Sequence, residues 1–118
     1  MKLLTEAQFV QLVQNGRLQA AVKGTSNEID FKPVVKLFDP CGAAIWLLTE
    51  IEPDDHDIAW GLCDLGMGCP EFGTVSLAEL GSVRGRLGLG IERDLYFEAD
   101  KPISAYCDEA RRLQRINA

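Results

Sequence analysis

The sequence contains no long apolar run and only one histidine. No stretch approaches the ~20 apolar residues that a membrane-spanning helix requires, which excludes a membrane protein of that kind. The first residues also lack the apolar centre of a signal peptide, so we expect a cytoplasmic protein with no membrane partner. Because His56 is the single imidazole, every mechanism that needs a histidine must use this one residue.

Paired cysteines and a phosphate-binding motif are absent as well. The four cysteines do not show the spacing of two to four residues that structural zinc sites use. We interpret Cys41, Cys63, Cys69 and Cys107 as free, buried thiols. The glycine-rich segment 81–90 lacks the lysine and hydroxyl residue of a phosphate-binding loop. We therefore expect no bound metal and no cofactor.

Positive charge is missing from the middle of the chain. The net charge is −6, but residues 39–83 contain nine carboxylates and no lysine or arginine, whereas the two flanking segments are slightly basic. Such a block produces a negative field wherever its carboxylates gather at the surface. Nucleic acid is therefore excluded as a direct partner of that face.

The remaining composition is that of an ordinary globular protein. With 118 residues, of which 47% are hydrophobic and 25% charged, the chain predicts one α+β domain spanning 1–118. Three β-rich segments separated by turn residues predict an antiparallel meander over 34–38, 44–50 and 58–63. A further strand is predicted over 92–98, which gives a mostly antiparallel sheet of four to five strands.

Three helices are expected to pack on this sheet. Thr5 and Gln8 form a capping box at the start of the first, and Gly16 is suited to end it in a left-handed conformation. Ser76 and Glu79 form a second capping box. The predicted helices are 5–15, 77–84 and 102–114.

The large apolar side chains of the strands are interpreted as core. Alternation along the third strand puts Trp60 and Leu62 on one face and Ala59 on the other. Aromatic groups on strands are more often core than surface, although an exposed contact patch is the alternative. The residues concerned are Trp46, Trp60, Met67 and Phe72.

The last predicted helix carries three arginines, Arg111, Arg112 and Arg115. Asp108 stands three positions before Arg111 and four before Arg112, and Glu109 stands three before Arg112, at the spacing of surface ion pairs. A solvated helix face is the preferred interpretation. Unpaired arginines would instead favour contact with RNA or DNA.

Seven carboxylates of the central block form the candidate partner-binding set. They are Glu50, Glu52, Asp54, Asp55, Asp57, Asp64 and Glu71. Carboxylates arrayed on a surface can occupy a site built for phosphates, so we expect a basic or nucleic-acid-handling protein as the partner. No residue is assigned a catalytic role, and a binding protein is favoured over an enzyme.

Two other interpretations stay open. Asp54, His56 and Asp57 share one loop, and with Asp64 they could hold a divalent cation that activates water, which predicts a small metal-dependent hydrolase or nuclease. The loop matches no calcium-binding template, and a solvated polar turn accounts for the same residues. A purely structural or oligomeric role is the third interpretation, since the oligomeric state is not fixed by the sequence.

Segments spread over nearly the whole chain resemble a known bacterial family. They are residues 33–38, 46–50, 61–68, 70–73, 76–80, 92–94 and 101–106. On these segments the chain resembles the domain of unknown function family 2958, whose members are small single-domain proteins often found on plasmids, phage-like and other mobile elements. The resemblance implies a mobile-element context and no catalytic residue. Together with the acidic block, this context suggests an anti-defence protein of the anti-CRISPR or anti-restriction kind.

Overall fold

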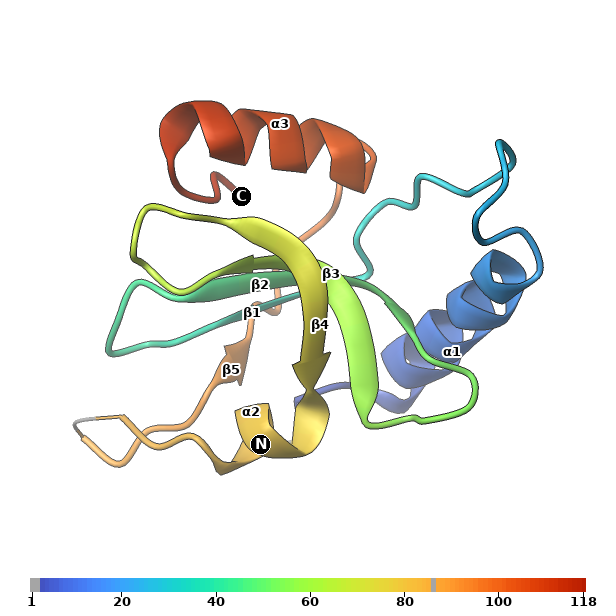
Figure 1. The fold of residues 1–118 in the computed structure, drawn as a ribbon. Coiled ribbons are helices and arrows are strands. Elements are labelled where there is room, and N and C mark those ends of the chain that lie inside the picture. Colours follow the sequence, from blue (N-terminus) through green and yellow to red (C-terminus); the bar gives the residue numbers. More distant parts are fainter. Residues whose placement is uncertain (1–2, 86) are drawn as a thin grey trace.

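The structure is a computed structural model that describes residues 3–85 and 87–118. Its centre is an antiparallel five-stranded sheet in the order β4-β3-β2-β1-β5 (Figure 1). The strands are β1 (Val35–Phe38), β2 (Ile45–Ile51), β3 (Ile58–Asp64), β4 (Glu71–Ser76) and β5 (Glu92–Arg93). The helices are α1 (Glu6–Ala20), α2 (Leu77–Ser82) and α3 (Ile103–Leu113). This architecture confirms the predicted α+β class and the meander.

The sheet separates two hydrophobic cores. Leu48 and Ala59 face α1 and α2, whereas Leu47 and Leu62 face α3. Figure 1 shows α3 above the sheet and α2 below it. Because successive side chains of a strand point to opposite faces, β2 is buried along nearly its whole length. The predicted division of β3, with Leu62 on one face and Ala59 on the other, is confirmed.

The start of α1 is as predicted, but its end is not. The N–H of Gln8 donates to the Thr5 hydroxyl at 3.1 Å, and the N–H of Thr5 donates to the Gln8 side chain at 3.0 Å. Gly16 does not end the helix, which continues to Ala20. A Cβ at Gly16 would lie only 1.8 Å from the carbonyl oxygen of Ile51. This glycine therefore serves the close approach of α1 to β2, and the predicted end at residue 15 is wrong.

The two outer strands also differ from the prediction. The segment 66–73, which lies outside every strand predicted above, contains the first half of β4. Gly66 and Gly68 form a turn with φ of 82° and 81°, but Gly73 lies in the strand opposite Gly61. The strand predicted over 92–98 is only two residues long, because the chain leaves the sheet and exposes Tyr96. Compared with the predicted sheet, the observed sheet therefore has an additional strand, β4, at one edge and a shorter strand, β5, at the other.

The cysteines are free, as predicted, but not all of them are buried. Cys107 is buried and Cys63 is partly buried, whereas Cys41 and Cys69 are exposed, so the interpretation of all four as buried thiols is wrong. Burial raises the pKa of Cys63 to about 11. Its thiol therefore stays protonated, and a poor nucleophile, at neutral pH.

Candidate partner-binding site

The seven predicted carboxylates lie in three places. Glu50 is within β2 and only 8% exposed. Asp64 and Glu71 are at the end of β3 that leads into β4, and Asp64 is 2% exposed. The other four lie in the loop between β2 and β3: Glu52, Asp54, Asp55 and Asp57. Because β3 is seven residues long, about 20 Å separates its two ends, and the set does not form one continuous surface.

Asp64 has a structural role at the far end of β3. One of its carboxylate oxygens accepts the N–H of Gly66 at 2.8 Å, and the other accepts the N–H of Ile116 at 2.9 Å. These bonds tie the turn after β3 to the segment that follows α3. A buried carboxylate held by two backbone donors is not accessible to a partner in this structure.

Asp57 also uses its carboxylate within the fold. It accepts the Ser76 hydroxyl at 2.6 Å and the N–H of Ala78 at 2.8 Å. The Ser76 hydroxyl in turn accepts the N–H of Glu79 at 3.2 Å, which confirms Ser76 as the N-cap of α2, but this is the one half of the predicted capping box found among the bonds of the described residues. The hydrogen bond from Ser76, followed by that from Ala78, lowers the pKa of Asp57. The loop is thus fastened to the first turn of α2.

Asp54 and Asp55 are the exposed carboxylates of the β2–β3 loop. Within residues 3–85 and 87–118 neither forms an ion pair. Asp55 accepts the N–H of Asp57 at 3.1 Å, which shapes the turn, and the ring of His56 lies edge-on to Phe9 with 5.6 Å between centroids. The loop therefore has an ordered backbone and presents two carboxylates to solvent without compensating charge.

An aromatic and charged cluster adjoins this loop on the α3 side of the sheet. The indole N–H of Trp60 donates to a carboxylate oxygen of Glu52 at 2.5 Å, and the Phe72 ring stacks beside it with 6.0 Å between centroids. The Lys23 ammonium lies 4.2 Å from the Trp60 ring centroid and 3.7 Å from Glu52. We call Lys23, Glu50, Glu52, Trp60 and Phe72 the Trp60 cluster. It holds a cation between an aromatic face and a carboxylate.

Glu50 is the buried member of this cluster, and it lies on the same face as Trp60 because of an irregularity in β2. The register with β3 shifts between Leu48 and Glu50, so Glu50 pairs with Trp60. Burial raises the pKa of Glu50, while the hydrogen bond with Gln19 and the charge of Lys23 act in the opposite direction. Alternation alone would have placed Glu50 on the other face, since a single extra residue reverses the side-chain pattern.

The apolar side chains predicted as core divide between core and surface. Trp46 is buried, as predicted, and Trp60 is partly buried. Phe72 is 44% exposed and Met67 is 75% exposed, so the core interpretation is wrong for these two. Phe72 lies in β4, the edge strand of the sheet, which has no further strand beside it. The alternative of an exposed contact patch applies to the part of the sheet around Trp60 and Phe72.

The residues proposed for a hydrolase do not converge. Asp64 is separated from the loop containing Asp54 and His56 by the whole of β3, and Asp57 is engaged by α2. Among the described residues, no three or more histidine, cysteine and acidic side chains are placed to hold a metal ion.

The arginines of α3 show one of the expected surface pairs, in which Arg111 donates to Asp108 at 3.1 Å.

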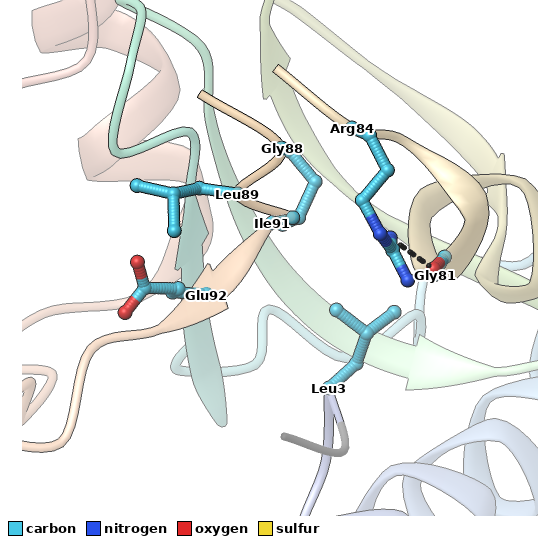
Figure 2. A pocket seen from close by; sticks show the side chains of 8 residues that line it. Leu3, Gly81, Arg84, Gly88, Leu89, Ile91 and Glu92 are labelled. Carbon is cyan, nitrogen blue, oxygen red and sulfur yellow. Dashed lines mark hydrogen bonds between the residues drawn. The ribbon is translucent and has the colours of Figure 1, made fainter. Parts of the chain in front are cut away.

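A cavity of about 520 Å³ lies between α2 and β5 (Figure 2). The Arg84 guanidinium donates to the carbonyls of Gly81 at 2.9 Å and Val83 at 2.7 Å, which satisfies acceptors at the end of α2. Figure 2 shows the Glu92 carboxylate pointing away from Arg84. The cavity is therefore lined by a turn with a structural arginine rather than by converging reactive groups.

The sequence model of the family described as Protein of unknown function (DUF2958) matches residues 3–117. The chain belongs to this family. The match confirms the resemblance noted in the sequence and extends over nearly the entire chain. No curated protein and no solved structure matches the chain. No helix in the described parts of this family member has the length and apolar character needed to cross a bilayer.

Proposed function

We propose that this protein binds a basic partner protein through the β2–β3 loop and the adjoining Trp60 cluster. The observation that supports this most directly is the pair of exposed carboxylates Asp54 and Asp55, which have no ion-pair partner in the described part of the chain and lie beside a site where a cation already contacts Trp60 and Glu52. A lysine- or arginine-bearing segment complements both features. The long-range field of the acidic block would steer such a partner toward this end of the sheet.

The proposed surface is smaller than the set of seven carboxylates. Asp64 and Glu50 are buried, and Asp57 is occupied by the cap of α2. Glu71 is exposed but lies at the other end of β3. The binding surface therefore consists of Glu52, Asp54 and Asp55 together with the exposed parts of Trp60 and Phe72.

The specific form of the proposal is an anti-defence protein of a bacterial mobile element, acting in the cytoplasm. Proteins that cut or bind nucleic acid carry positive surfaces shaped for phosphates. An acidic surface can compete for such a site, which is the chemistry expected of an anti-CRISPR or anti-restriction protein. The support is the charge distribution and the family resemblance, and no catalytic step is required.

The test is a calorimetric titration with hexa-arginine, compared between the wild type and the double variant Asp54→Asn/Asp55→Asn. We expect measurable binding at about 50 mM salt that weakens strongly at about 300 mM, because the charges are exposed. The double variant is expected to bind about tenfold more weakly. Glu71→Gln, which removes an exposed carboxylate from the other end of β3, is the matched control and should change little.

Binding of the same strength by the double variant and the wild type would reject the proposed surface. Absence of hexa-arginine binding to the wild type would reject a basic partner altogether. If binding is observed, affinity capture from the host with the wild type and the double variant in parallel would identify the partner, which should be lost with the double variant.

A further inference from the structure

Two members of the Trp60 cluster, Trp60 and Glu52, form the receptor for the cation, and the sheet holds them in place. Trp60 belongs to β3, and its indole N–H is bonded to Glu52 at 2.5 Å. The N–H of Glu52 donates to the carbonyl of Ile58 at 2.9 Å, which continues the ladder between β2 and β3. The ring and the carboxylate are therefore positioned before any cation arrives, which reduces the entropic cost of binding one.

The cation that occupies this receptor is held only by surface interactions. Lys23 lies in the turn that follows α1, and its side chain is 51% exposed. Its contacts in the cluster are the ring of Trp60 and the carboxylate of Glu52. An exposed ion pair and an exposed cation–π contact are both weak, so another cation can displace this lysine.

A second aromatic ring, that of Phe72, adjoins Trp60. The Phe72 and Trp60 rings are inclined by only 25° to each other, with 6.0 Å between their centroids. Phe72 is 44% exposed, so this surface is open to solvent on the β4 side. A planar guanidinium can stack on such rings and also bind a carboxylate with paired donors, which an ammonium cannot do.

We propose that Trp60, Phe72 and Glu52 form a recognition site for one arginine side chain of the partner, and that Lys23 occupies this site in the free protein as a built-in competitor. The inference rests on the proposed function, because it names the residue of the basic partner that the surface recognises. Glu50, the buried member of the cluster, lies opposite Trp60 in the pairing of β2 with β3. On binding, the guanidinium takes the place of the Lys23 ammonium, which moves into solvent.

The proposal predicts opposite effects for the two halves of the site. Lys23→Ala should bind hexa-arginine about fivefold more tightly than the wild type, because it removes the competitor. Lys32→Ala is the matched control: it removes the same charge from another exposed lysine. This control should tighten binding less than twofold. Glu52→Gln should weaken binding about fivefold, and Trp60→Phe should weaken it while keeping an aromatic ring in the sheet.

A second measurement reports on the site alone. In a two-dimensional NMR titration of the intact protein with Nα-acetyl-argininamide, the indole N–H resonance of Trp60 should shift, whereas that of the buried Trp46 should not. The shift should be reached at lower concentration in Lys23→Ala. Nα-acetyl-lysinamide should give a smaller shift, and a larger one would overturn the assignment to arginine.

Equal hexa-arginine affinities for Lys23→Ala and Lys32→Ala would overturn the competitor role of Lys23. An unmoved Trp60 resonance, with binding that still depends on Asp54 and Asp55, would reject the arginine site and leave the proposed function in place. Absence of hexa-arginine binding to every variant would reject both.

Discussion

At one end of β3 the carboxylate of Asp64 is buried and accepts two backbone N–H groups, whereas at the other end Asp54 and Asp55 are exposed and form no ion pair with any residue that the structure describes. All three belong to the same acidic block of the sequence. Asp64 stabilises the fold because backbone hydrogen bonds replace the water that its carboxylate has lost. Asp54 and Asp55 contribute to the negative electrostatic field but add little to the stability. The charges in the sequence therefore indicate the sign of the charge on a surface, whereas burial in the fold decides which carboxylates a partner can reach.

The strongest test of this difference is Asp64→Ala. Removing the carboxylate leaves the buried N–H of Ile116 without its acceptor and takes away the bond to the N–H of Gly66 in the exposed turn, and we expect the free energy of unfolding to fall by about 3 kcal/mol. Urea unfolding followed by circular dichroism measures the change. The double variant Asp54→Asn/Asp55→Asn should stay within about 0.5 kcal/mol of the wild type. Equal losses for the two proteins would contradict the division of roles.

A smaller loss is expected for Asp57→Ala, which removes the acceptor at the start of α2. The pKa of Asp57 is lowered from its ordinary value of 3.8, so its stabilising effect is complete above that value and is lost as the pH falls through the lowered pKa. The urea midpoints of the variant and the wild type should therefore differ at neutral pH and converge in acid. A difference that persists unchanged at the lowest pH would rule out the carboxylate as its cause.

The smallest effect, and one of opposite sign, is expected for Glu50→Gln. Because burial raises the pKa of Glu50 above its ordinary value of 4.5, the charged form destabilises the folded protein. The variant should be slightly more stable than the wild type at neutral pH. As the pH falls through the raised pKa toward 4.5, Glu50 becomes protonated and the free energy of unfolding of the wild type rises toward that of the variant. Glu71→Gln, an exposed control, should leave the stability at neutral pH close to that of the wild type. A loss of stability in Glu50→Gln at neutral pH would refute the predicted sign of the effect.

The parts of the fold that the sequence predicts are those with strong local signals. The β-branched and aromatic runs mark β1, β2 and β3, and the Thr5 capping box marks the start of α1. The end of α1 is not predictable locally, because the role of Gly16 depends on the backbone of β2, which is distant in sequence. β4 is not predictable locally for a related reason, because Gly73 is typical of a turn, whereas pairing with β3 holds it in an extended strand.

The sequence predicts the sign of the charge at the candidate site, but not which residues form the site. The absence of lysine and arginine from residues 39–83 indicates a negative surface, and the exposed Asp54 and Asp55 agree with it. The cation contributed by Lys23 comes from outside that block, so the charge pattern does not predict it. Lys23 follows α1 and is 37 positions before Trp60, and only the packing of the folded chain brings the two side chains together.

The order of the strands has a further consequence for chain entropy. β1 to β4 are joined by three connections of six residues each and pair in sequence order, so their contacts close short loops. Only β5 must return across the intervening chain, to place Glu92 beside Phe38. The cost of long-range loop closure is thus concentrated at one margin of the sheet, where a two-residue strand offers few bonds to offset it. Opening of the native protein is therefore easiest at this margin, far from the edge formed by β4.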